Sequence, residues 1–232
     1  MRQYIALLSI CIAVTSWSQG VEPTAIPAQK LSTEPVIDGV VDATEWAEAL
    51  EIATFYNPVR GGRAEQPTRA YLGYTDEAIY VAFVCDDTEP ELIQAQQTRR
   101  DSNLENDDRV VFAVDPQARG LSPYQFMVNP LGTQRLNVPE GALENVRWQG
   151  DWSAASRITA TGWSAEMRIP FRILRVSAGQ TQLGVALARY SPRRAESYLF
   201  PNTGGYFSLR LQTLWQGITI PRRTASVVAL PY

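Results

Sequence analysis

An acidic loop at residues 99–108 carries most of the side chains in this sequence that could do chemistry. It holds Glu105, Asp107 and Asp108 close together, and such a density of carboxylate oxygens is what Ca²⁺ takes as ligands. Earlier in the loop, the guanidinium of Arg100 could fork onto a carboxylate or a sugar acid, which makes Arg100 and its neighbour Asp101 candidate binding residues. The plainer interpretation is a solvated loop with internal Arg–Asp pairs, because exposed pairs of this kind are common.

A second candidate site lies on residues 134–151, a stretch that lacks a strand pattern. Trp148 and Trp152 flank Gly150 and Asp151 at its end. Two tryptophans on a loop could form a stacking platform for a sugar or for a partner chain. The alternative is that one or both hold the loop against the domain, because tryptophan is mostly buried in folded proteins.

Catalytic groups are scarce. The chain has no histidine, which excludes Ser-His-Asp triads, Cys-His pairs and histidine metal sites. A glycosidase needs two carboxyl groups roughly 5–9.5 Å apart across a cleft, whereas Asp107 and Asp108 are neighbours on an expected strand and point to opposite faces. The net charge of −3, with scattered arginines, argues against a nucleic-acid surface. We expect a non-catalytic protein that binds no nucleic acid.

Apolar periodicity predicts the strands that would position these side chains. Alternation of period two occurs at residues 124–128, 163–169, 183–187 and 207–211, and continuous apolar runs occur at 79–85 and 110–114. Cys85 ends one such run and is expected to be buried. Helical signal is confined to short stretches after Thr44 and Pro90. The sequence therefore predicts an all-β fold, an antiparallel β-sandwich with one or two short helices.

The ends of the chain predict processing and domain boundaries. Residues 1–18 have a basic start, an apolar run and small residues at the exit, which is typical of a secretory signal peptide. We interpret 19–33 as a lead-in, 34–213 as the β-sandwich, and 214–232 as a connector at which a second domain could start. The protein is expected to be exported, to the periplasm or the extracellular space.

Four short segments follow one another in a particular order. They lie at residues 36–46, 74–81, 107–115 and 162–171. In this order they resemble the family 9 carbohydrate-binding modules, over roughly residues 34–211. The resemblance implies a β-sandwich that binds glycan chains or chain ends, often with structural calcium, and a role in polysaccharide catabolism.

The resemblance is closer to one subgroup of these modules. It is carried by Arg100-Asp101, Asp107-Asp108, residues 128–132 and the ending at 221–232. In that subgroup the module is the exported N-terminal region of a bacterial protein that continues into a predicted outer-membrane barrel of unknown function. This implies an outer-membrane association, with a barrel partner or a missing barrel domain.

The sugar-contacting positions of the family can be transferred one by one. Sugar-binding members have a tryptophan where this chain has Glu105, a glutamate where it has Val111, and an arginine where it has Met127. Their second aromatic residue corresponds to Phe200. Sugar binding uses an aromatic face and fixed polar groups, and most of that set is absent at the aligned positions.

Three functions are consistent with these features. The leading hypothesis is an exported, non-catalytic carbohydrate-binding module. The alternative is a periplasmic interaction or assembly domain of an outer-membrane barrel protein, or a fragment of one, without sugar affinity. The third is a part of a glycoside hydrolase, because modules of this family are often found in such enzymes.

Overall fold

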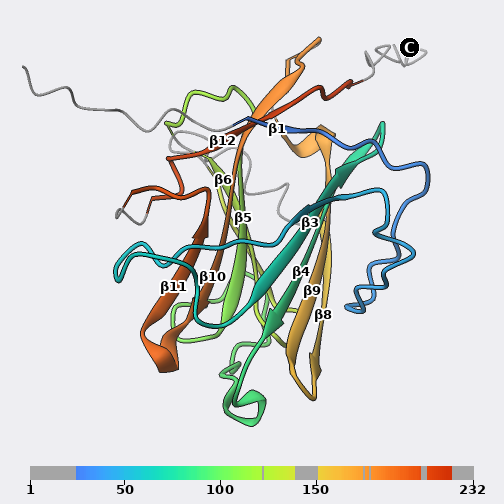
Figure 1. The fold of residues 1–232 in the computed structure, drawn as a ribbon. Coiled ribbons are helices and arrows are strands. Elements are labelled where there is room, and N and C mark those ends of the chain that lie inside the picture. The colour runs from blue at the N-terminus through green and yellow to red at the C-terminus, as the bar shows by residue number, and fades with distance from the viewer. Residues whose placement is uncertain are drawn as a thin grey trace, which may run out of the picture.

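Two β-sheets pack face to face in the computed structural model (Figure 1). The structure describes residues 25–121, 123–138, 151–174, 176–177, 179–204 and 208–220. The predicted all-β sandwich is confirmed. The expected signal peptide at 1–18, Trp148 and the ending at 221–232 lie outside the described residues. In the part of the chain that is described, no helix is long and apolar enough to span a bilayer.

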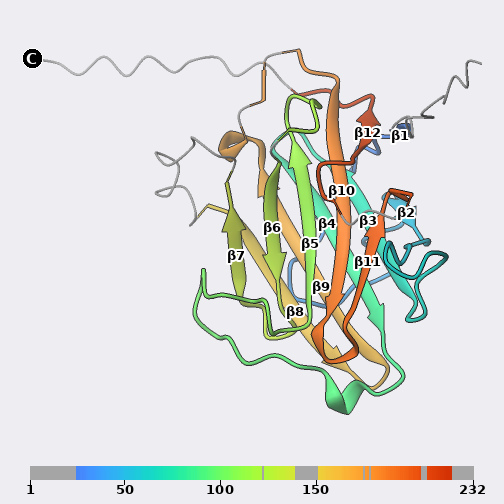
Figure 2. The same ribbon diagram turned by 90° about the vertical axis from the view of Figure 1, so that its left-hand side faces the viewer.

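The larger sheet has the strand order β1-β12-β10-β5-β6-β7, and β11 pairs with the second half of β10 (Figure 2). In chain order these strands are β1 (Ala25–Pro27), β5 (Arg109–Asp115), β6 (Tyr124–Val128), β7 (Gln134–Asn137), β10 (Gln182–Ser191), β11 (Glu196–Phe200) and β12 (Thr213–Gln216). The pairs are antiparallel except for β1 with β12, which is parallel. This sheet therefore extends past both ends of the expected range 34–213.

The smaller sheet has the order β2-β3-β4-β9-β8, and its neighbouring strands are all antiparallel. Its strands are β2 (Leu50–Ile52), β3 (Thr68–Tyr74), β4 (Ala78–Asp86), β8 (Ser153–Thr159) and β9 (Gly162–Pro170). The only helical elements among the described residues are short 3-10 turns: η1 (Pro90–Leu92), η3 (Phe171–Ile173) and η4 (Pro192–Arg194). The helix expected after Pro90 is such a turn, and the stretch after Thr44 forms turns.

The strand expected at residues 207–211 is wrong in its described part. Residues 208–211 form a turn and a bend, and Leu211 is 45% exposed. The free side of β10 is already occupied, because β11 pairs with Leu187–Ser191 and β12 pairs with Gln182–Val185. Residues 208–211 are left to connect these two partners.

The main core lies between the sheets and includes Trp163 and Cys85; the burial of Cys85 is as expected. Burial raises the pKa of the Cys85 thiol to about 12. Trp46 is also buried but lies elsewhere, in a cluster with Leu31 and Tyr80 on the outer face of the smaller sheet. We call residues 31–49, which cover this face, the N-terminal strap.

A single carboxylate ties the N-terminal strap to the smaller sheet. Glu166 of β9 is fully buried. Its Oε2 accepts hydrogen bonds from the backbone N–H groups of Asp38 (3.0 Å) and Gly39 (2.8 Å), and its Oε1 accepts one from Nε1 of Trp46 (2.9 Å). Burial raises the pKa of Glu166 against these hydrogen bonds. Burial of a carboxylate is tolerated here because donors surround both of its oxygens.

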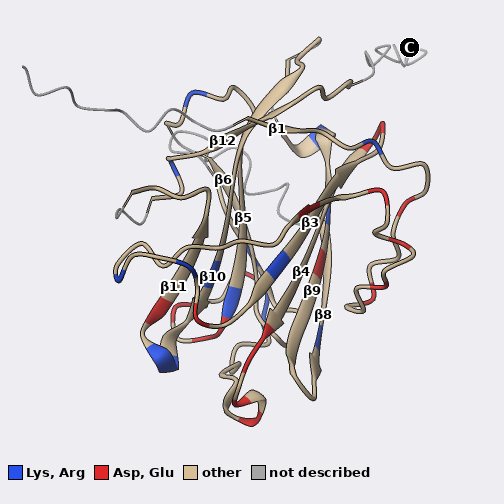
Figure 3. Cartoon of the chain, in the orientation of Figure 1, with Lys and Arg blue, Asp and Glu red and all other residues tan. Residues whose placement is uncertain are grey.

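A buried ionic cluster joins the two sheets at the η4 end of β10. The side chain of Asp87 is fully buried and lies 3.6 Å from Arg189, 2.5 Å from Arg193 and 3.3 Å from Arg194. Figure 3 shows the basic η4 turn at the lower end of the larger sheet. The cluster links β10 and η4 to the segment that follows β4.

Candidate functional site

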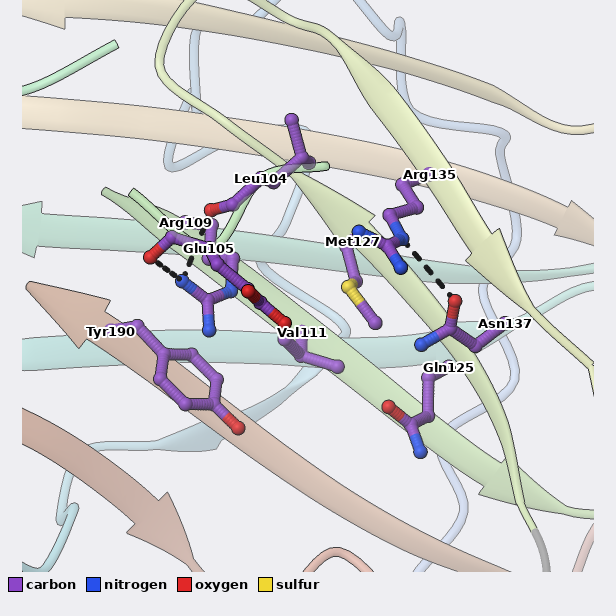
Figure 4. Close-up of a pocket in the computed structure, with 9 residues that line it drawn as sticks. All are labelled: Leu104, Glu105, Arg109, Val111, Gln125, Met127, Arg135, Asn137 and Tyr190. Atoms are coloured by element: carbon purple, nitrogen blue, oxygen red, sulfur yellow. Dashed lines mark hydrogen bonds between the residues drawn. The ribbon is translucent and has the colours of Figure 1, made fainter. Parts of the chain in front are cut away.

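A pocket of about 130 Å³ opens on the outer face of the larger sheet (Figure 4). It lies over β5, β6, β7 and β10, which are side by side in Figure 2. Its lining residues are Leu104, Glu105, Arg109, Val111, Gln125, Met127, Arg135, Asn137 and Tyr190.

The register of the sheet brings these side chains together from distant parts of the chain. Val111 of β5 is paired with Met127 of β6, and Met127 is paired in turn with Arg135 of β7. Because directly opposed residues share a face, these three form a row. Ala188 of β10 pairs with Val111 on the other side, and its small side chain leaves room above the sheet.

Neighbouring rows complete the walls of the pocket. Tyr190 is paired with Arg109, and Gln125 is paired with Asn137. The floor is apolar, because Leu104 packs with Val111 and Met127 in a buried cluster on this face. The pocket thus has an apolar base with polar and aromatic side chains at its edges, the composition typical of small-molecule sites.

Arg109 is held rigidly at one end of the pocket. Its Nη1 donates to the carbonyl oxygens of Leu104 and Glu105, each at 3.1 Å. Its Cζ lies 3.9 Å from the ring centroid of Tyr190, within the range of a cation–π contact. Burial lowers the pKa of Arg109 and raises that of Tyr190 to about 12, so at neutral pH the guanidinium is charged and the phenol is neutral.

Arg135 stands at the other end and is held by amide oxygens. Its Nη1 donates to Oδ1 of Asn103 at 2.8 Å, and its Nε donates to Oδ1 of Asn137 at 3.3 Å. Figure 4 shows Arg135 beside Met127 and Asn137, and Arg109 beside Glu105 and Tyr190. Two arginines and one carboxylate therefore border the same small space.

The acidic loop does not assemble a cation site. Asp107 is 1% exposed, and its carboxylate accepts hydrogen bonds from the backbone of Gln96 (3.1 Å) and Gln97 (3.0 Å) and from Nδ2 of Asn129 (2.8 Å). Asp108 is fully buried and accepts one from the backbone of Gln94 at 2.7 Å. These carboxylates anchor residues 94–97 to the start of β5.

The third proposed calcium ligand, Glu105, is exposed and accepts a hydrogen bond from Nδ2 of Asn103. Among the described residues, no three His, Cys, Asp or Glu side chains are placed to hold a metal ion. Both oxygens of Asp107 and Oδ2 of Asp108 accept hydrogen bonds from backbone N–H groups of residues 94–97, and Oδ2 of Asp107 also accepts one from Asn129, so Glu105, Asp107 and Asp108 do not converge on one point.

Arg100 and Asp101 make the internal contacts of the plainer interpretation. Nε of Arg100 lies 3.9 Å from Oδ2 of Asp101, and Arg100 donates a hydrogen bond to the side chain of Gln134. The Arg100 guanidinium lies 5.6 Å from the ring centroid of Trp152. Asp101 accepts a hydrogen bond from the backbone of Leu136 at 3.3 Å. Both residues attach the loop to β7, and neither lines the pocket.

The aromatic candidates lie away from the pocket. Trp152 is 3% exposed and packs edge-on against Phe126 at 5.1 Å between the ring centroids, so it presents no stacking face to solvent. Phe200 is paired with Leu187 and packs against the core between the sheets. The aromatic residue at the pocket is Tyr190, which the sequence did not single out.

The positions transferred from the sugar-binding modules do meet in space. Glu105, Val111 and Met127 all line this one pocket. Sequence reasoning missed Arg135 and Asn137 because β7 falls in a stretch without a strand pattern. Gln125 could have been found, because it shares a face with Met127 two residues along the expected strand 124–128.

Comparisons with known proteins identify similar structures but no similar sequence. No protein-family model matches the chain, and no curated protein is significantly similar to it. A family 9 carbohydrate-binding module from Caldicellulosiruptor kristjanssonii, solved with cellotriose, is similar with a TM-score of 0.59 and 15% identity, over 90% of this chain and all of that one. A second structure from this organism, with glucose, has a TM-score of 0.58 and 16% identity, over 89% and 100% of the two chains.

A proposed carbohydrate-binding protein from Bacteroides uniformis is similar with a TM-score of 0.54 and 12% identity, over 86% of this chain and 94% of that one. At such identities the similarity concerns the fold. The chain therefore has the β-sandwich fold of the family 9 carbohydrate-binding modules.

Proposed function

We propose that this protein is an exported, non-catalytic carbohydrate-binding module, and that the pocket on the larger sheet binds a sugar unit at the end of a glycan chain. The observation that carries the proposal is the convergence of Glu105, Val111 and Met127 on one pocket. These are the positions at which the resemblance places sugar contacts. The similarity of the fold to structures solved with cellotriose and glucose supports it.

The polar groups missing from the aligned positions are present at neighbouring ones. Met127 replaces the arginine of the sugar-binding modules, but its partner across the strands is Arg135. Val111 replaces their glutamate, and Glu105 brings a carboxylate to the same pocket from the preceding loop. A guanidinium and a carboxylate are thus both available to sugar hydroxyl groups, supplied from different positions.

The size and lining of the pocket suit one end of a chain better than its middle. A volume of about 130 Å³ is below the ~300–1,000 Å³ of pockets that enclose drug-sized ligands. A terminal sugar would rest its C–H surface on Val111 and Met127 and meet Tyr190 at the side. Glu105 is the one carboxylate among the described lining residues, whereas glycoside hydrolysis uses two.

Titration calorimetry with a panel of oligosaccharides tests this function. The wild-type protein should bind at least one of them, and Asn137→Ala should weaken that binding about five- to tenfold, the effect of losing one hydrogen-bonding group of about 1 kcal/mol or slightly more. Asn202→Ala is the matched control, because Asn202 is exposed and lies outside the pocket. An absence of binding across the panel, with and without calcium, would refute the proposal.

Export is part of the same proposal. It rests on the signal-peptide pattern of residues 1–18. Expression of the full chain in a bacterial host, followed by N-terminal sequencing of the mature protein, should find a start at residue 19. Recovery of uncleaved protein from the cytoplasm alone would argue against it.

A further inference from the structure

Most arginines in the described chain that make side-chain contacts are paired with carboxylates, but the two in the pocket are not. Arg168, Arg172 and Arg189, among others, lie within 4 Å of an Asp or Glu oxygen. Within the described residues, Arg109 and Arg135 form no such ion pair and are held instead by carbonyl and amide oxygens. Their positions are fixed, and their charges are not neutralised by a direct partner.

The described hydrogen bonds also leave donors unused on both side chains. They occupy Nη1 of Arg109, and Nη1 and Nε of Arg135. Nη2 of each arginine has no hydrogen-bond partner among the described residues. A guanidinium with two adjacent donors is well matched to a carboxylate, which it can bind through both oxygens.

The electrostatics of the pocket favour a negative ligand. Burial is the main cause of the lowered pKa of Arg109; Tyr190 and Glu105 act to raise that pKa, and the charge of nearby Arg135 acts to lower it. The described lining carries these two positive charges against the single negative charge of Glu105, whose side chain is exposed. An anion bound between the arginines would relieve their mutual repulsion.

Resting on the function proposed above, we infer that the preferred ligand of this pocket is an acidic sugar: a glycan end whose terminal unit carries a carboxylate, as in a uronic acid. The carboxylate would pair with Arg109 and Arg135, and the ring would lie over Val111 and Met127. Asn137 and Gln125 would face its hydroxyl groups. Glu105 would oppose the ligand charge and so lower its affinity.

Calorimetric titration with chemically matched ligands tests this specificity. The probes are oligomers of galacturonate and of glucuronate, each compared with the same oligomer after reduction of its carboxyl groups to primary alcohols. At low ionic strength the acidic form should bind at least about tenfold more tightly than the reduced form, a difference of about 1.4 kcal/mol. Added salt should reduce that ratio, because it screens the charges.

Two variants should move the specificity in opposite directions. Arg135→Gln should remove most of the preference for the acidic form, because it removes one of the two positive charges of the pocket. Glu105→Gln should raise the ratio of acidic-form to reduced-form affinity, because it removes a negative charge that repels only the acidic form. Arg210→Gln and Glu51→Gln are controls with the same charge changes on exposed residues outside the pocket, and they should leave the ratio unchanged.

The outcomes distinguish the preference for an acidic sugar from sugar binding itself. Equal or tighter binding of the reduced oligomers would overturn the acidic specificity and leave the sugar-binding function standing. A lower ratio of acidic-form to reduced-form affinity in Glu105→Gln than in wild type, or equal effects of Arg135→Gln and Arg210→Gln on that ratio, would also overturn it. Acetate binding as tightly as the uronates would show an anion site without sugar recognition. If no oligosaccharide of either kind binds, the proposed function fails as well.

Discussion

Replacing Glu166 by glutamine should loosen the N-terminal strap from the smaller sheet. The buried carboxylate accepts two backbone N–H groups, of Asp38 and Gly39, on one oxygen and the indole N–H of Trp46 on the other. A glutamine side chain has nearly the same shape but only one acceptor oxygen. Its amide N–H₂ group must therefore face either the two backbone N–H groups or the indole N–H. The N–H groups on that side of the site then meet another donor and lose their acceptor.

The size of the effect follows from these contacts. A hydrogen bond to a charged group contributes ~1.5–3 kcal/mol, and a buried donor left without an acceptor costs a similar amount. Losing one side of the Glu166 site should lower the free energy of unfolding by about 3 kcal/mol. For a chain of this size that corresponds to a fall in Tm of roughly 6–12 °C.

Urea denaturation followed by tryptophan fluorescence provides the assay, since Trp46 itself lies in the strap. Glu51→Gln is the matched control, because Glu51 is exposed on β2, and its effect should stay within about 0.5 kcal/mol. If Glu166→Gln unfolded with a free energy equal to that of Glu51→Gln within error, the carboxylate would not be what holds the strap, and the reasoning would be refuted.

Two further predictions concern the end of the sandwich where β4 leads into Asp87. Burial acts to raise the pKa of Asp87. Hydrogen bonds from the Glu89 backbone and from Arg193 and Arg194 nevertheless hold this pKa below its usual value of 3.8. The ionised Asp87 therefore stabilises the folded protein above pH 3.8, and this stabilisation is lost as the pH falls through the lowered pKa of the folded state. Asp87→Asn should therefore destabilise by about 3 kcal/mol near neutral pH, and urea unfolding should show a smaller difference from wild type below pH 3.8; a constant difference would contradict this. With a pKa of about 12, Cys85 should react with a thiol reagent at mildly alkaline pH only after denaturation, and rapid labelling of the native protein would disprove that.

The architecture could be predicted from local pattern because its strongest strands carry their own signal. β4 and β5 are continuously apolar, β9 alternates cleanly, and the structure places all three at the centres of the two sheets. β7 and β12 have no such signal. β7 pairs with β6 over four residues, and β12 pairs with β10 over four residues and with β1 over three, so the position of each is decided by its partners and not by its own composition.

The pocket was harder to predict for a related reason. The resemblance located Glu105, Val111 and Met127. The side chains that supply charge and aromatic surface, such as Arg135 and Tyr190, are brought to the pocket by the register between paired strands. The acidic loop misled in the opposite way. In the sequence, Asp107 and Asp108 resemble cation ligands. In the fold, they accept hydrogen bonds from backbone N–H groups of residues 94–97, which the sequence does not place beside them.

The parallel pairing of β1 with β12 has a practical consequence for presenting the molecule on a solid support. β12 pairs with the first residues of β10 and β1 lies beyond β12, at the top in Figure 1, whereas Tyr190 of the pocket lies near the other end of β10. The five residue-to-residue steps from Val185 to Tyr190 span roughly 17 Å at ~3.4 Å each. A sensor chip or bead coupled at a cysteine introduced at the exposed end of β12, for example at Gln216, would therefore hold the sandwich by one end and leave the Tyr190 end of the pocket facing the analyte.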